Sequence, residues 1–269
     1  MAMRHVKHIP SPPLSQFVDC FWHLEGYHPS HSRELSLPDG CVDIIFNLGQ
    51  KTTRFYDRED RLLNLGAVVL CGPHTDYFAI DTVYEARVIG IHFKPGGARL
   101  FVDQPLDAYL NVHLTLDTHW GINFEDIFDE LTAVSDPEKM FRILERWLLT
   151  YVNQTPMRHQ AVQYALSELR RLPVAKVINQ IGMSHRRFNQ LFKEEIGMTP
   201  KLLSRMYRFQ EVLCCLTRDN GRKWADIAVS CGYYDQAHFI KDFQSFSGIN
   251  PTAYRPIKGR HRQHTKFPE

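Results

Sequence analysis

The stretch "GYYDQAHFIKDF" at residues 232–243 decides how the last third of the chain folds, because an earlier stretch repeats its pattern. A turn glycine, a helix-starting polar residue, two phenylalanines, a second glycine and a proline all recur. Five pairs lie 51 residues apart: Ser184 and Asp235, Phe188 and Phe239, Phe192 and Phe243, Gly197 and Gly248, Pro200 and Pro251. The turn glycines, Gly182 and Gly232, lie 50 residues apart. A period this long indicates one supersecondary unit used twice.

Each unit is predicted to be helix, glycine turn, helix. Ser184 and Asp235 are good N-caps, since a side-chain oxygen can accept hydrogen bonds from the free N–H groups of a first turn. The paired phenylalanines at i and i+4 predict a buried stripe. A connecting helix over residues 200–217 would be roughly 25 Å long. Two recognition helices at its ends, with the width of the flanking units added, could reach successive major grooves about 34 Å apart.

The outer face of the first unit carries side chains suited to DNA. These are His185, Arg186, Arg187, Asn189, Gln190 and Lys193. In the major groove Arg reads guanine, and Asn or Gln reads adenine. The alternative is two helix pairs with ordinary solvated faces that pack as a bundle. Caps, turn glycines, charge and repeat spacing agree with one another, which favours the DNA reader.

The net charge of +2 conceals a division between two parts of the chain. Residues 1–157 carry 13 Lys and Arg against 21 Asp and Glu, whereas residues 158–269 carry 19 against 9. The first part therefore has a net charge of −8 and the second of +10. A basic segment beside an acidic remainder is expected when one domain approaches a polyanion.

The first part predicts strands and then two helices. Strand-like runs separated by Gly, Pro, Asn and Asp occupy residues 15–97: "FVDCFWHL", "CVDIIFNL", "AVVLCG", "YFAI" and "YEARVIGIHF". Short turns without intervening helices indicate an antiparallel barrel or sandwich. From Trp120 the apolar spacing changes to three and four, so "WGINFEDIFDEL" and "PEKMFRILERWLLTYV" are predicted amphipathic helices. The polar segment "NQTPMRH" at 153–159 is the predicted boundary.

Residues 160–257 resemble the DNA-binding domain of the AraC/XylS family of bacterial transcription regulators. The resemblance rests on the two units and on "GYYDQAHFIKDFQSFSGINPTAYR" at 232–255. Residues 15–116 are similar to the cupin-like N-terminal regions of such regulators through "PDGCVDIIFNLG" (38–49) and "FKPGGA" (93–98). The resemblance implies DNA-facing positions at Arg186, Asn189, Gln190, Gln236, Ala237, His238 and Lys241. Ala237 can at most meet a thymine methyl, so the second helix should discriminate less.

We therefore expect a multi-domain α and β protein with four segments. They are a β-rich cupin-like sensor barrel (1–118), a helical dimerisation or linker segment (119–157), an all-α double helix-turn-helix domain (158–257) and a basic tail (258–269). The candidate DNA-binding residues are His185, Arg186, Asn189, Gln190, Lys193, Gln236, Ala237, His238 and Lys241. The tail region "RPIKGRHRQHTK" (255–266) is expected to be disordered, and it either adds sequence-independent attraction to phosphate or is a solvated terminus without function.

Catalytic, metal and cofactor sites are not expected. The six cysteines show no CxxC spacing, and His74 and His92 are isolated, with Glu85 between them at no recognisable spacing. "FKPGGAR" fits either an anion-binding nest or, more simply, a glycine turn. The start of the chain lacks a long apolar core, and no window approaches eighteen apolar residues, so we expect a cytoplasmic protein without a membrane segment.

The predicted function is a sequence-specific, ligand-responsive DNA-binding transcription regulator. Expected partners are double-stranded DNA, a small-molecule effector, a second copy of the chain and, as the resemblance implies, RNA polymerase. Two alternatives remain. One is a DNA repair or modification enzyme with the same reader, which would need an activated thiol among Cys20, Cys41 and Cys71. The other is a ligand-independent DNA-binding protein.

Overall fold

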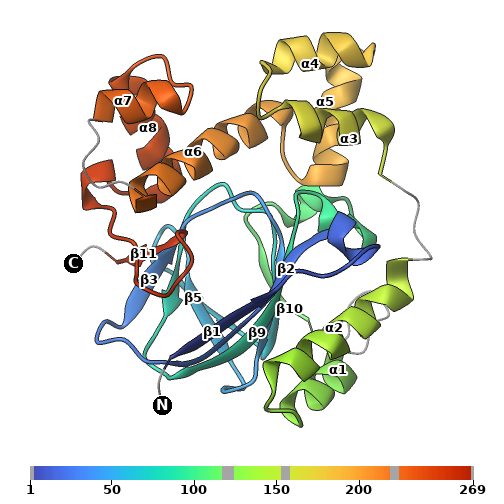
Figure 1. Ribbon diagram of the computed structural model, residues 1–269, viewed down its shortest axis with the longest axis vertical. Coiled ribbons are helices and arrows are strands. Elements are labelled where there is room, and N and C mark those ends of the chain that lie inside the picture. The colour runs from blue at the N-terminus through green and yellow to red at the C-terminus, as the bar shows by residue number, and fades with distance from the viewer. Residues whose placement is uncertain (1–2, 117–123, 153–157, 219–223, 268–269) are drawn as a thin grey trace.

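The computed structural model describes residues 3–116, 124–152, 158–218 and 224–267. Figure 1 shows a β-sheet body with a layer of helices across one end and a helix pair along its flank. The predicted β-rich N-terminal part and all-α C-terminal part are confirmed. Two predicted features lie outside the described residues: the start of the helical linker segment (119–123) and most of the boundary segment (153–157).

The β-sheet body consists of two antiparallel sheets. The six-stranded sheet has the order β1-β2-β9-β4-β7-β10 and the five-stranded sheet the order β11-β3-β8-β5-β6. The strands of the first are β1 (Arg4–His8), β2 (Val18–Tyr27), β4 (Asp43–Asn47), β7 (Val68–Cys71), β9 (Ala86–Phe93) and β10 (His113–Thr115). Those of the second are β3 (Arg33–Ser36), β5 (Thr53–Tyr56), β6 (Leu62–Leu65), β8 (Phe78–Asp81) and β11 (His264–Lys266).

Alternation along β4 shows how the larger sheet separates two environments. Ile44 and Phe46 are buried in the main hydrophobic core, whereas Asp43, Ile45 and Asn47 line an internal cavity. Successive side chains of a strand point to opposite faces, so "DIIFN" supplies both surfaces. One face of this sheet therefore packs and the other remains free for polar groups.

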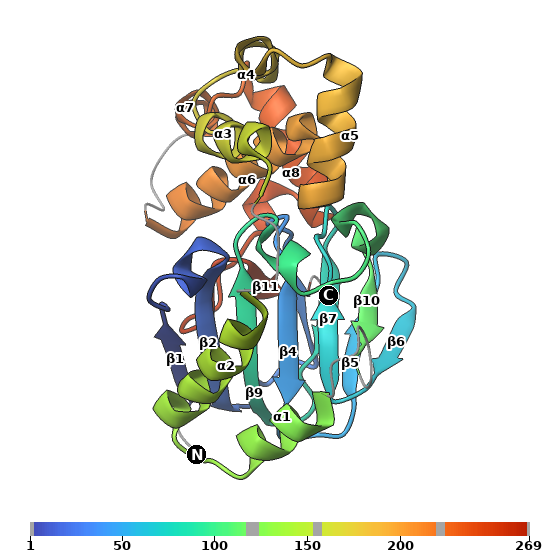
Figure 2. The same cartoon turned by 90° about the vertical axis from the view of Figure 1, so that its right-hand side faces the viewer.

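Helices α1 (Phe124–Thr132) and α2 (Pro137–Val152) cover the packed face, and Figure 2 shows α2 lying across β2 and β9. Phe141, Leu144 and Leu148 are completely buried there, and Phe141 stacks on His8 at a ring separation of 5.5 Å. The apolar stripe of this segment, whose place in the chain made it a candidate for dimerisation on the family resemblance, is thus used within the chain. A dimer contact through these helices would have to use their other, mostly exposed face.

The C-terminal helices form the double helix-turn-helix arrangement. They are α3 (Gln160–Glu168), α4 (Val174–Ile181), α5 (His185–Ile196), α6 (Pro200–Arg218), α7 (Trp224–Ser230) and α8 (Gln236–Ser247). Phe188 and Phe192 belong to one core cluster, and Phe239 and Phe243 to another, while α6 contributes to both. The predicted connecting helix and the repeated buried stripe are confirmed.

The basic tail differs from the prediction. Instead of being disordered, residues 264–266 form β11, which pairs with β3 so that Thr265 lies opposite Leu35. Thr265 is fully buried, and the backbone N–H of Leu37 donates to the carbonyl of Gln263 at 2.9 Å. The positive charge of the tail suggested disorder. The acidic residues that bind the tail, Glu34 on β3 and Asp39 in the turn after it, are distant in the sequence, so the strand could not be predicted locally.

Candidate nucleic-acid interface and barrel cavity

Helix α5 presents the first set of candidate reading residues. Gly182 adopts φ +71°, which lets the chain turn from α4, and the Ser184 hydroxyl then accepts from the Arg187 N–H at 3.4 Å. Because Phe188 and Phe192 turn inward, the opposite face is left to the predicted DNA-binding residues. His185, Arg186, Gln190 and Lys193 are exposed, and Asn189 is half-buried.

Two of these side chains are free to bind a ligand. Among the residues that the structure describes, neither Arg186 nor Lys193 makes a hydrogen bond or an ion pair. Gln190 differs, because its Nε2 donates to Glu194 Oε1 at 3.0 Å. A base edge would therefore compete with Glu194 for Gln190 but would find Arg186 available.

Helix α8 presents the second set on the same scaffold. Asp235 Oδ1 accepts from the His238 N–H at 2.7 Å, and Phe239 and Phe243 are fully buried. The predicted residues Gln236, Ala237, His238 and Lys241 are all exposed. The imidazole of His238 packs edge-on against the Tyr233 ring, with centroids 5.3 Å apart.

A buried ion pair that sequence analysis missed braces the second unit. Asp242 on α8 accepts from Arg205 Nη2 at 2.6 Å and Nε at 3.1 Å, and both donors come from α6. The Asp242 side chain is 6% exposed. The only sequence signal was an acidic residue on an otherwise apolar stripe.

Both recognition helices are held against the β-sheet body at their C-terminal ends. At Gly197 a Cβ atom would lie 2.5 Å from Pro73, and at Gly248 it would lie 2.2 Å from Tyr77. The first turn of α5 is about 18 Å from that contact at 1.5 Å per residue. The N-terminal halves of α5 and α8 thus point away from the barrel, as Figure 1 shows.

The "FKPGGA" turn is one of these docking points, so the glycine-turn interpretation is confirmed. Gly96 adopts φ +73° and packs on the backbone of Glu195, while a Cβ at Gly97 would collide with the Phe17 carbonyl at 1.9 Å. Lys94 Nζ donates to the carbonyl of Ser15 at 2.6 Å. The Gly97 N–H donates to the carbonyl of Lys94 at 2.7 Å, so this N–H and the Lys94 ammonium are both engaged within the protein.

A cavity of about 800 Å³ lies inside the β-sheet body and reaches the helical layer. Its wall includes Trp22 and Tyr27 of β2, Tyr207 and Gln210 of α6, and tail residues from 260 to 264. Gln210 Nε2 also donates to the carbonyl of Pro38 at 2.8 Å, which joins α6 to the barrel beside the cavity. The barrel, helix α6 and the tail therefore all line the same cavity.

His92 is not isolated in space, contrary to the expectation from spacing. Its Nδ1 lies 3.0 Å from Asp43 Oδ2, and its Nε2 lies 3.3 Å from Asp39 Oδ2. Burial acts to lower the pKa of His92, but the two carboxylates reverse this and hold it well above its ordinary value. Burial acts to raise the pKa of Asp39, and the His92 imidazolium reverses that, leaving it well below normal. Spacing could not reveal this cluster, because β4 and β9 bring its members together.

His74 has a structural role. It stacks on His113 with centroids 4.3 Å apart, against Phe78 of β8. Burial lowers the pKa of His74 to about 4 and that of His113 well below its ordinary value, so both rings are neutral near pH 7.

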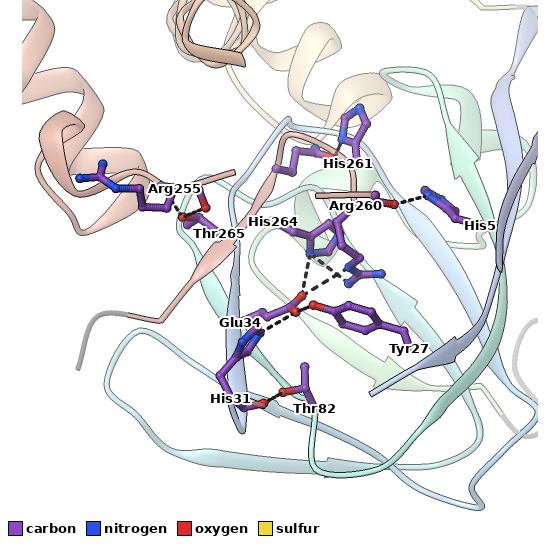
Figure 3. A network of polar contacts seen from close by, with 12 residues as sticks. His5, Tyr27, His31, Glu34, Thr82, Arg255, Arg260, His261, His264 and Thr265 are labelled. Carbon is purple, nitrogen blue, oxygen red and sulfur yellow. Dashed lines mark hydrogen bonds and ion pairs between the residues drawn. The ribbon is translucent and has the colours of Figure 1, made fainter. Parts of the chain in front are cut away.

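Figure 3 shows how the tail is fixed to the barrel around Glu34, which is completely buried on β3. Arg260 Nε lies 3.4 Å from Glu34 Oε2, and the Tyr27 hydroxyl donates to Glu34 Oε1. Arg260 Nη2 also contacts His264 Nδ1 at 3.2 Å. Because Arg260 can only donate, His264 must accept through a neutral ring. The tail connects the end of the second unit to this network.

Comparison with known proteins matches both parts of the chain. Residues 6–115 match the family described as a domain of unknown function (DUF6597), and residues 177–256 match the family described as a helix-turn-helix domain. Among the described residues, no helix combines the length and apolar character needed to cross a membrane.

Curated relatives are regulators. The HTH-type transcriptional activator RhaR of Yersinia pseudotuberculosis serotype O:3 (strain YPIII) is 26% identical over 139 residues, which cover 51% of this chain and 46% of the relative. An uncharacterized HTH-type transcriptional regulator of Haemophilus influenzae is 26% identical over 133 residues, 44% of each protein. The match thus spans about half the length of these relatives.

Similar solved structures include ToxT from Vibrio cholerae, with a TM-score of 0.46 and 10% identity over 94% of this chain and 97% of that one. A second ToxT structure, solved with an unsaturated fatty acid bound, has a TM-score of 0.41 and 13% identity over 93% of this chain and 91% of that one.

Proposed function

We propose that this chain, which carries an AraC-type helix-turn-helix domain behind a DUF6597 domain, is a sequence-specific DNA-binding transcription regulator. The observation that supports this most directly is the pair of equivalent units at the two ends of α6. At 19 residues, α6 spans about 28 Å, so α5 and α8 can enter neighbouring major grooves of one duplex. The relatives named as transcriptional activators favour activation, with RNA polymerase as the further partner.

The roles we assign follow from side-chain chemistry. Arg186 reads a guanine, and Asn189 and Gln190 read adenine edges. His185, Lys193 and Lys241 contact phosphate, while Gln236 and His238 make the remaining contacts of α8. Ala237 can only meet a thymine methyl. On this assignment α5 supplies most of the sequence preference and α8 mainly affinity.

The barrel is proposed to regulate the reader by holding it. Both recognition helices rest on the barrel at their C-terminal ends, and the cavity is lined by barrel, α6 and tail together. A small-molecule effector that fits one arrangement of these parts better than another would change how both helices meet DNA. This makes the chain ligand-responsive without contact between effector and DNA. A homodimer would add a second pair of reading helices.

The thiol environments favour a regulator over an alkyl-transfer enzyme. Burial raises the pKa of Cys20 and Cys71, and burial together with the charge of Asp39 raises the pKa of Cys41 to about 12. A nucleophilic cysteine needs the opposite shift, since the thiolate is the reactive form.

Selection of bound duplexes from a random DNA pool tests the proposal. We expect one enriched motif with two parts, and affinity that falls steeply between about 50 and 200 mM salt. The Arg186→Ala variant should lose preference at one position, whereas Arg142→Ala, which removes an exposed arginine from α2, should select the wild-type motif. Failure of the wild-type protein to enrich any sequence would refute the proposal.

A further inference from the structure

Four side chains with metal-binding chemistry meet on the cavity wall. Asp39 and Cys41 come from the "LPDGC" turn before β4, and Asp43 is the first residue of that strand. His92 of β9 lies directly opposite Asp43 in the register of the two strands. All four line the cavity, so their donor atoms are accessible from the internal space rather than from the outer surface.

The distances suit a metal ion. One donor atom each from Asp39, Cys41 and His92 lies within 4.8 Å of the others. In a tetrahedral zinc site with bonds of about 2.0–2.1 Å, neighbouring nitrogen and oxygen ligands are about 3.3–3.4 Å apart. His92 Nε2 and Asp39 Oδ2 are already 3.3 Å apart. Nitrogen and sulfur ligands of zinc are about 3.6 Å apart, so the sulfur, which lies within 4.8 Å of the other two donors, is close enough to complete the set after a small movement.

The surrounding contacts are those of a metal site. Metal-binding histidines usually donate their other ring N–H to a carboxylate, which orients the ring. Asp43 is placed to accept from His92 Nδ1 at 3.0 Å and itself accepts from Trp22 Nε1 at 3.3 Å. The Nε2 atom is thereby directed towards Asp39. The other oxygen of Asp39 accepts from the Cys41 backbone N–H at 2.8 Å, which fixes the carboxylate.

We propose that Asp39, Cys41 and His92 bind a divalent transition-metal ion of the zinc type, with Asp43 orienting His92. A mixture of thiolate, imidazole and carboxylate favours such ions over Mg²⁺ or Ca²⁺. Binding displaces one proton from the Cys41 thiol and one from His92 Nε2 to solvent. Three protein ligands leave a fourth coordination position, which faces the cavity. The proposal goes beyond the proposed function, because it requires neither DNA nor an organic effector.

The same oxygen of Asp39 links the ion to the tail. Gln263 Nε2 donates to Asp39 Oδ2, the atom assigned to the metal. A metal ion bound between Oδ2 and His92 Nε2 replaces the direct contact of these two atoms. Gln263 can still donate to Oδ2, so the tail would contact a ligand of the proposed metal.

Cobalt(II) titration of the chelator-treated full chain tests the site. We expect one ion per chain and a thiolate-to-cobalt charge-transfer band that an equimolar amount of Zn²⁺ removes. Cys41→Ser should abolish the band, and Asp43→Asn should weaken binding about 10–100-fold. The matched control is Cys214→Ser, which removes a partly exposed thiol from α6 and should leave band and stoichiometry unchanged.

A second measurement needs no variant. Calorimetric titration of the chelator-treated wild-type protein with Zn²⁺ should give one site per chain, and repeating it in buffers of different ionisation enthalpy should show that protons are released on binding, since thiol and imidazole ligands bind in their deprotonated forms. Absence of a cobalt–thiolate band, a band that persists in Cys41→Ser, or Zn²⁺ binding without proton release would overturn the proposal. Since no DNA is present, these outcomes leave the proposed DNA binding untouched.

Discussion

The two helix-turn-helix units share a scaffold but differ in what they expose. Their caps, turn glycines and inward phenylalanines correspond at a spacing of 50 or 51 residues. At the same spacing Arg186 of α5 corresponds to Ala237 of α8, and Leu191 corresponds to the buried Asp242. Packing fixes the first set of positions, whereas the outer positions are free to vary. The difference indicates one duplicated fold carrying two outer surfaces of unequal chemistry.

Support for the two units also differs. The core of the first unit lies mainly within the helical layer, whereas the second shares its core cluster with Leu35, Leu37 and Ala79 of the barrel. In addition, Asp242 ties α8 to α6. The second unit therefore shares an apolar core with the barrel, whereas the first rests on the barrel through the turns at Pro73 and Gly96.

Removing an equivalent buried phenylalanine from either unit should reduce stability more than any other substitution considered, and by a similar amount in both units. Phe188→Ala and Phe239→Ala each delete a completely buried ring, and each should lower the free energy of unfolding by about 3–5 kcal/mol. Hydrogen exchange read separately on α5 and α8 measures the loss. A loss below about 1 kcal/mol in either unit would break the structural equivalence, because surface substitutions have effects of that size.

The Asp242 brace should matter only to the second unit. Asp242→Asn leaves Arg205 without its charged partner and should destabilise α8 by about 1.5–3 kcal/mol, the range for hydrogen bonds to charged groups. Exchange in α5 should not change. Glu211→Gln, an exposed acid on α6, is the matched control. Equal destabilisation of α5 would mean that the brace serves the whole domain.

The exposed positions should separate the two reading surfaces. Arg186→Ala should weaken binding by about 1–3 kcal/mol and relax one base position, while Lys193→Ala should weaken all sequences alike. The reverse exchange, Ala237→Arg, should give α8 a preference for guanine that it lacks. Competition binding with single-base variants of the selected site measures both. If Arg186→Ala weakened specific and random DNA equally, Arg186 would be a phosphate contact.

The caps should give the smallest effects. Asp235→Ala should destabilise its unit by about 1–2 kcal/mol and Ser184→Ala by about 0.5 kcal/mol, within the range for N-cap removal. We expect the larger loss for Asp235 because its carboxylate accepts from the His238 N–H at 2.7 Å, whereas the Ser184 hydroxyl accepts from the Arg187 N–H at 3.4 Å. Denaturant unfolding of the single variants is sufficient, and the reverse order would show that these distances do not govern the caps.

The sequence predicted most clearly those features that depend on near neighbours. The connecting helix, the repeated stripe and α2 follow from apolar spacing, and strands β2, β4, β7, β8 and β9 were recognised as apolar runs. Strands β1, β3, β5, β6 and β10 were not, because each has at most five residues and none is an uninterrupted apolar run. β11 forms because it pairs with Leu35 and because Arg260 contacts Glu34, and both partners lie more than two hundred residues earlier in the chain.

The same distinction applies to the sites. The candidate DNA-binding residues of α5 follow from helical spacing and those of α8 from the family resemblance, and the structure leaves eight of the nine exposed and Asn189 half-buried. The group of Asp39, Cys41 and His92 could not be inferred, since the pairing of β4 with β9 creates it. The ion pair of Asp242 could not be predicted for a related reason, because its partner Arg205 is brought near only when α8 packs on α6.

The central claim is that α6 holds two unequal readers at a fixed separation that matches one turn of DNA. Inserting base pairs between the two parts of the selected site tests it most directly. An insertion of about five base pairs places the parts on opposite sides of the duplex, and about ten moves them one turn further apart. We predict that both insertions reduce binding to the level of a site with only the α5 part. Unchanged affinity for either DNA would contradict the account.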